Sequence, residues 1–172
     1  MIDYTRFDFS SIFGVAKSTE SLKRNQTRGL RAEVLEKAIA KYSDKQLEYI
    51  GNTQNGRDFL GVEDNFFYES KSMDGLFQKK VLYTKEITLK NFQGKNLGLP
   101  EKTFDYMLLW DTKNYTVGIC SWDACMKNTV IKDATVVFRV DYSDITFLAQ
   151  NVTPIEKEEL SAKFDKLIEE FL

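Results

Sequence analysis

Apolar residues recur at three- and four-residue spacings near both ends of the chain, and this spacing predicts two amphipathic helices. The first helix is expected at residues 28–42, directly after Thr27. The second is expected to begin at Thr153-Pro154, with glutamates in its first turns, where the helix dipole favours acidic side chains. Residues 1–26 carry aromatic side chains without a regular period, so either an arm or a short helix fits them.

Short segments rich in strand-forming residues and bounded by turn-forming residues predict β-strands in the middle of the chain. The expected strands cover residues 47–50, 57–62, 65–72, 86–89, 104–110, 115–122, 135–140 and 145–149. Glu63-Asp64 separates the second strand from the third and predicts a tight hairpin turn, whereas residues 94–100 are expected to form a loop. The order of helix, strands and helix favours an α/β fold with a mixed central β-sheet flanked by helices.

The length and composition are typical of one folded domain, and we expect residues 1–172 to form it. Apolar residues make up 42% of the chain and aromatic residues 13%, which suffices for a hydrophobic core. No run of about 18 apolar residues is present, so no membrane span is expected, and residues 1–10 lack the features of a signal peptide. Cys120 and Cys125 have no further cysteine to complete a zinc site, so we expect two free thiols in a reducing cytoplasm.

The chain contains no histidine, which excludes Ser-His-Asp and Cys-His catalysis and histidine-ligated metal centres. Acid–base chemistry must then come from aspartate, glutamate, lysine, tyrosine or water. A metal held by oxygen ligands alone would be a hard cation such as Mg²⁺.

Charge is distributed unevenly along the chain, although the net charge is only −2. Residues 17–45 contain eight basic and four acidic side chains, and residues 71–102 contain seven basic and three acidic ones. Residues 141–172 contain three basic and eight acidic side chains. A basic face for nucleic acid is compatible with this distribution, and so is an ordinary solvated surface.

The most informative segment is the predicted hairpin between Asp58 and Lys71. Side chains alternate along a strand, so Glu69 and Lys71 should share one face while Tyr68 and Ser70 point the other way. The hairpin should return Asp58, near the start of its first strand, to a place beside Glu69. Two carboxylates and one ammonium group are therefore expected to converge, with Glu63-Asp64 at the far end of the hairpin.

Metal-dependent phosphodiester hydrolysis requires this set of groups. Asp58 and Glu69 would hold a divalent cation that keeps open positions for water and a phosphate oxygen, and the carbonyl group of Ser70 is a further candidate ligand. Lys71 would orient or deprotonate the attacking water and stabilise negative charge. The alternative is a solvated strand face, but charges at the end of so apolar a strand are costly unless they have a function.

The pattern Asp58…Glu69-Ser70-Lys71 resembles the motif of the PD-(D/E)XK nuclease superfamily, and the short chain is similar to the small type II restriction endonucleases within it. Arg57 stands where the motif often has proline. The resemblance implies a restriction-endonuclease-like fold, Mg²⁺ as cofactor, Asp58 and Glu69 as metal ligands and Lys71 as the catalytic lysine. It also implies a homodimer that cuts both strands at a short specific site in double-stranded DNA.

Some members of the superfamily add a glutamate from the first helix. Glu33 and Glu36 are the candidates here, and Glu33 is preferred. Both glutamates are equally compatible with a solvated helix surface.

Residues that could contact DNA follow the predicted catalytic strand. Lysines there would pair with phosphates, and glutamines and asparagines would read base edges. The candidates are Gln78, Lys79, Lys80, Lys85, Lys90, Asn91, Gln93 and Lys95. A lysine-rich surface loop explains them as well. Arg24, Arg28 and Arg31 form a second candidate patch, facing either phosphates or a dimer partner.

Two other functions remain compatible with the sequence. One is a structure-specific nuclease of the same fold, such as a junction resolvase or a repair nuclease. The other is a non-enzymatic interaction module that uses the aromatic N-terminal segment and the acidic C-terminal helix. Cleavage of branched DNA would favour the first, and absence of both metal and DNA binding would favour the second.

Overall fold

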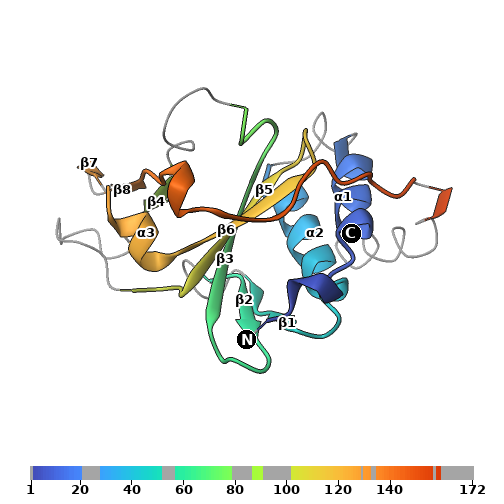
Figure 1. Ribbon diagram of the computed structural model, residues 1–172, viewed down its shortest axis with the longest axis horizontal. Helices are drawn as coiled ribbons and strands as arrows, with labels where there is room; N and C mark the ends of the chain where they lie inside the picture. The colour runs from blue at the N-terminus through green and yellow to red at the C-terminus, as the bar shows by residue number, and fades with distance from the viewer. Residues whose placement is uncertain are drawn as a thin grey trace.

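The protein is represented by a computed structural model, and the residues described are 2–20, 28–51, 57–78, 87–90, 102–128, 130–132, 135–156 and 158–159. Within these residues a long mixed sheet crosses the molecule (Figure 1). Helices α1 and α2 lie at one end of the view in Figure 1, and a smaller sheet with helix α3 lies at the other end. None of the described helices is long and apolar enough to cross a membrane.

The main sheet contains six strands among the described residues, in the order β1-β2-β3-β5-β6-β9. Strands β3 and β5 are parallel, and the other neighbouring strands are antiparallel. The strands are β1 (Leu47–Tyr49), β2 (Phe59–Gly61), β3 (Phe67–Met73), β5 (Tyr106–Asp111), β6 (Thr116–Ser121) and β9 (Thr146–Ala149). The expected mixed sheet flanked by helices is therefore present, and each of its strands falls on a segment that the sequence predicts.

A second, antiparallel sheet has the order β4-β8-β7. Its strands are β4 (Ile87–Lys90), β7 (Val130–Lys132) and β8 (Thr135–Phe138). Strand β7 and the short helix α3 (Trp122–Met126) were not predicted. The side chain of Ser121 accepts a hydrogen bond from the backbone N–H of Ala124 and so caps α3, which ends the expected strand one residue earlier than predicted.

The N-terminal segment forms a single 3₁₀ turn, η1 (Tyr4–Arg6), followed by helix α1 (Phe9–Ser18). Asp8 caps α1 through a hydrogen bond from the backbone N–H of Ser11. Of the two possibilities for this segment, the helix is the correct one. Helix α2 (Arg28–Lys41) agrees with the predicted helix at residues 28–42.

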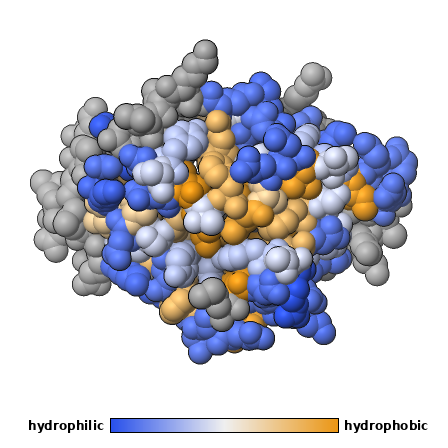
Figure 2. Space-filling model, in the orientation of Figure 1, coloured by the Kyte–Doolittle hydropathy of each residue, from blue (hydrophilic) through white to orange (hydrophobic). Residues whose placement is uncertain are grey.

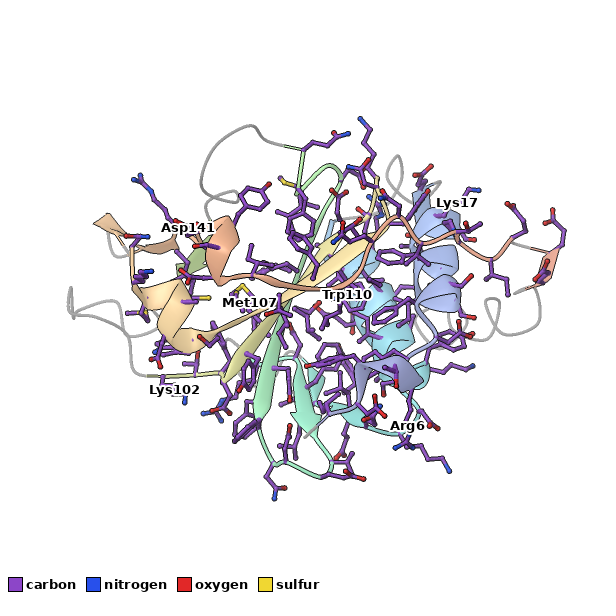
Figure 3. All side chains as sticks on the ribbon, viewed as in Figure 1. Arg6, Lys17, Lys102, Met107, Trp110 and Asp141 are labelled. Atoms are coloured by element: carbon purple, nitrogen blue, oxygen red, sulfur yellow. The ribbon has the colours of Figure 1, made fainter. Side chains whose placement is uncertain are left out.

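Apolar side chains form a cluster on each face of the main sheet. Strand β5 shows the division, because Leu108 and Trp110 join the cluster beneath α1 and α2, whereas Met107 and Leu109 join the cluster on the opposite face. Figure 3 labels one residue of each cluster, Trp110 on the helix side and Met107 nearer to α3. Apolar residues also reach the surface over the middle of the face in Figure 2, surrounded by hydrophilic residues.

The predicted C-terminal helix does not begin at Thr153-Pro154, and this prediction is wrong. The backbone there is held against α1 instead. Ser10 donates its hydroxyl to the carbonyl group of Thr153 at 2.7 Å, and its own carbonyl accepts the N–H of Ile155 at 3.0 Å. Residues 158–159 are helical, whereas the rest of the predicted helix, like the expected loop at 94–100, lies outside the described residues.

Candidate functional site

The hairpin formed by β2 and β3 places the first acidic residue of the candidate site. Phe59 pairs with Tyr68 in the antiparallel register, and the backbone N–H of Asp58 donates to the carbonyl group of Tyr68 at 2.8 Å. Asp58 therefore lies across from Glu69, as the alternation along the hairpin predicts. Asp64 lies at the turn, where it accepts hydrogen bonds from the backbone of Phe66 and from the Tyr68 hydroxyl.

The two carboxyl groups are nearly inaccessible to solvent. Asp58 is 7% exposed and Glu69 is 5% exposed. The backbone N–H of Ser70 donates to Oδ2 of Asp58 at 2.8 Å, which fixes the orientation of that carboxylate. The carboxyl groups of Asp58 and Glu69 are close enough to form a hydrogen bond with each other when one is protonated.

Lys71 lies at the open side of this acid pair. Its Nζ atom is 3.2 Å from Oε1 of Glu69, and its side chain is 35% exposed, compared with 7% for the side chain of Glu69. The ammonium group thus reaches both solvent and the buried carboxylate. A substrate phosphate approaching from solvent would meet Lys71 before it met the acids.

Burial and mutual repulsion make this pair unfavourable as two free anions. Burial, and after it the charge on Asp58, raise the pKa of Glu69 to about 7, against the opposing effect of Lys71. Burial also raises the pKa of Asp58, against the hydrogen bond from Ser70 and the charge of Lys71. A divalent cation between the two carboxylates would remove this repulsion.

A third acidic group approaches the pair from α2, and it belongs to Glu36. Burial, and after it the charges of Asp58 and Glu69, raise the pKa of Glu36 to about 9. The preferred candidate, Glu33, lies beside Glu36 and Tyr49. The structure thus brings Glu36, the second choice from the sequence, toward the acid pair.

The donor set fits a hard cation, because it consists of oxygen atoms alone. Among the described residues, however, no three histidine, cysteine, aspartate or glutamate side chains lie close enough together to form a ready-made metal site. The ligands on this chain would therefore be Asp58, Glu69 and the carbonyl group of Ser70, completed by water and substrate. Glu36 would act from a greater distance or through a water molecule.

The predicted DNA-binding residues are only partly described. Gln78 is exposed at the turn that follows β3, with its side-chain Nε2 3.4 Å from Oδ1 of Asn114. Lys90 ends β4, of which the backbone is described. The candidates outside the described residues are Lys79, Lys80, Lys85, Asn91, Gln93 and Lys95.

The second candidate patch, of three arginines, is also partly described. Arg24 lies outside the described residues, and Arg28 begins α2. Arg31 has internal partners: its Nε donates to Oγ1 of Thr19 at 3.3 Å, and Nη2 donates to Oδ1 of Asp74 at 3.5 Å. These contacts tie α2 to the end of α1 and to the turn after β3, which indicates a structural role for Arg31.

No protein-family model matches the chain, and no curated protein matches it in sequence. The interpretation of the site therefore depends on its own residues. Its central features are the buried Asp58–Glu69 pair and the half-exposed Lys71 beside it.

Proposed function

We propose that the protein is a Mg²⁺-dependent endonuclease that hydrolyses phosphodiester bonds in double-stranded DNA. The observation that carries the proposal is the buried pair of Asp58 and Glu69 with Lys71 Nζ 3.2 Å from Glu69. Buried carboxylates without a cation destabilise a fold, so their presence in the main sheet favours a functional reason for them. The resemblance of Asp58…Glu69-Ser70-Lys71 to a nuclease motif supports the same conclusion.

Each residue of the site would have a separate role in hydrolysis. A divalent cation, when bound, supplies positive charge to the phosphate and lowers the pKa of a water molecule. Asp58 and Glu69 would hold that cation, and the backbone N–H of Ser70 keeps the Asp58 carboxylate oriented. Lys71 would donate hydrogen bonds to the attacking water and to a phosphate oxygen, which stabilises the charge that develops as the ester bond breaks.

Site-specific cleavage by a homodimer, as in type II restriction endonucleases, is the narrower form of the proposal. The resemblance of Asp58…Glu69-Ser70-Lys71 to the motif of those enzymes supports it. The two cysteines of the chain are free and buried, which is compatible with a reducing compartment such as the cytoplasm. The base-reading residues of such an enzyme would lie on the segment after β3.

The direct test is digestion of plasmid and phage DNA with Mg²⁺, followed by sequencing of the fragment ends. The wild-type protein should give discrete fragments, and Glu69→Gln and Lys71→Ala should lower the cleavage rate by about 10²–10⁴-fold because each removes a group that acts on the reacting atoms. Glu63→Gln is the matched control, because Glu63 is an exposed acid at the opposite end of the same hairpin.

Other outcomes would identify the competing functions. Cleavage of branched DNA without cleavage of linear duplex would replace the restriction proposal with a structure-specific nuclease. A wild-type protein that binds neither Mg²⁺ in calorimetry nor DNA at low salt would contradict any nuclease function and favour an interaction module.

A further inference from the structure

Arg57 is a cation next to the candidate site that the proposed hydrolysis does not use. It directly precedes Asp58, at the position where the PD-(D/E)XK motif often has proline. The resemblance to that motif therefore implies no function for it. The contacts that Arg57 makes in this chain nevertheless indicate a function for it.

The guanidinium group of Arg57 lies over the ring of Phe67, with Cζ 4.1 Å from the ring centroid. Phe67 precedes Glu69 by two residues on β3, so the two side chains project from the same face of that strand. Two residues of strand span about 7 Å. The guanidinium group therefore lies beside the acid pair on the same face, rather than within it.

Two contacts hold the guanidinium plane in place. Its Nε donates to the carbonyl group of Thr103 at 2.7 Å, and its face contacts the Phe67 ring. These contacts do not involve the two Nη groups of the guanidinium group. In the described part of the chain, neither Nη group has a carboxylate partner. With respect to the described residues, Arg57 is thus a positioned cation whose Nη groups have no carboxylate partner.

The acidic residue at the start of β5 does not neutralise Arg57. Asp105 forms an ion pair through Oδ1 with Lys102 Nζ at 3.0 Å, and its Oδ2 accepts the backbone N–H of Phe67 at 2.8 Å. Among the described residues, Asp105 forms no ion pair with Arg57. Among the described residues, Arg57 thus keeps its positive charge without an ion pair, and it can accept an anion.

We propose that Arg57 binds a phosphate of the DNA strand next to the phosphodiester on which Asp58 and Glu69 act. This inference rests on the proposed nuclease function. A guanidinium fork matches two phosphate oxygens, and a fork that is already fixed loses little side-chain entropy on binding. Arg57 is a substrate-binding and positioning residue, because its place beside the acid pair keeps it away from the reacting atoms.

The test compares Arg57→Met and Arg57→Lys with the wild-type protein. Methionine keeps an unbranched stem against Phe67 but removes the charge and the fork, and lysine keeps the charge alone. Arg6→Met is the matched control, since Arg6 is an exposed arginine whose Nε already binds Asp44 at 2.8 Å (Figure 3). Binding to a labelled DNA duplex is measured over a series of salt concentrations, with Ca²⁺ in place of Mg²⁺, and kcat and KM are measured with Mg²⁺.

Arg57→Met should weaken DNA binding by about 10–100-fold. It should also lower the slope of log K against log salt by about one, the change expected for one lost phosphate contact. KM should rise by a larger factor than kcat falls. Arg57→Lys should recover part of the affinity, and Arg6→Met should leave both the affinity and the slope unchanged.

Wild-type affinity and salt slope in a folded Arg57→Met protein, with normal cleavage by the wild type, would overturn this inference and leave the nuclease function intact. A wild-type protein that neither binds nor cleaves DNA would overturn both. If Arg57→Met does not fold, Arg57→Lys provides the test, because a dissociation constant equal to that of the wild type would contradict the two-donor contact between the guanidinium group and a phosphate.

Discussion

The acidic side chains of the candidate site show how single residues set its chemistry. Glu36, Asp58 and Glu69 interact with one another and with the ammonium group of Lys71, and burial raises the pKa of all three carboxyl groups. The metal-free protein should therefore hold protons at this site near neutral pH. Binding of a divalent cation should release them, so that metal affinity rises with pH.

Glu36→Gln should stabilise the metal-free protein at alkaline pH. The folded protein has a Glu36 pKa of about 9, compared with an ordinary value of 4.5. Between these two values the folded state binds more protons than the unfolded state, so the free energy of unfolding falls as pH rises. The variant lacks this penalty, and its melting temperature in chelator should exceed that of the wild type at about pH 8 and approach it at about pH 5.

Glu33→Gln is the control for this measurement, because Glu33 lies one turn earlier on the same helix. An equal, pH-dependent rise in the melting temperature of Glu33→Gln would show that any glutamate on this helix surface has the same effect on stability. A rise in the melting temperature of Glu36→Gln that does not depend on pH would contradict the raised pKa of Glu36.

Between elements, the connection that follows β3 is held by one buried carboxylate at the end of β5. Asp111 is completely buried, and Oδ1 accepts the N–H of Gly75 at 2.9 Å while Oδ2 accepts the N–H of Phe77 at 3.0 Å. It also accepts hydrogen bonds from Lys113 and Asn114 in the β5–β6 turn. Burial alone would raise the pKa of Asp111, but these hydrogen bonds outweigh it and lower the pKa.

Asp111→Asn should lower the free energy of unfolding by about 2–4 kcal/mol, because an amide nitrogen cannot accept the hydrogen bonds that one carboxylate oxygen now accepts. The stabilisation by Asp111 is present above its ordinary pKa of 3.8 and is lost as pH falls through the lower folded value. Urea unfolding at about pH 7 and about pH 3 should therefore show a smaller difference between variant and wild type at the lower pH.

Asp141→Asn is the matched control for Asp111→Asn. Asp141 caps the 3₁₀ turn η4 (Tyr142–Asp144) by accepting the N–H of Ser143 at 2.9 Å, and this hydrogen bond is exposed. Its replacement should cost about 1 kcal/mol or less. A loss for Asp111→Asn no larger than this would show that the hydrogen bonds to Asp111 do not anchor the turn.

For the whole molecule, the candidate site lies in the part of the main sheet formed by β2 and β3, with α2 close by. The described part of one chain carries one such site. Cutting both strands of a duplex at a symmetric sequence would therefore require two chains related by a two-fold axis.

The homodimer proposal predicts that two copies of the 172-residue chain bind one duplex. Mass measurement of the complex, with Ca²⁺ in place of Mg²⁺, should give this stoichiometry, and cleavage should yield ends placed symmetrically about the centre of the site. One chain per duplex together with cuts in a single strand would contradict the dimer and leave hydrolysis itself unaffected.

Local features of the chain were predictable from the sequence. The spacing of apolar residues located α2, because a helix buries one stripe whatever it packs against. The alternation of side chains along two strands joined by a short turn placed Asp58 across from Glu69. It could do so because the register of a hairpin depends on residues that are close in the sequence. The core of the candidate site is such a local feature, and this is why the sequence indicates it.

Features that depend on contacts between distant segments were decided by the tertiary structure. The rotation of α2 about its own axis brings Glu36 rather than Glu33 toward the acid pair. The spacing of apolar residues along the helix does not fix that rotation. The backbone at Thr153 is not helical, and Ser10, far away in the sequence, donates a hydrogen bond to its carbonyl group. The sequence by itself therefore determined the strands of the main sheet, the hairpin and its three charged residues. Packing determined the neighbours of those residues, because each neighbour lies on a segment whose position no local pattern encodes.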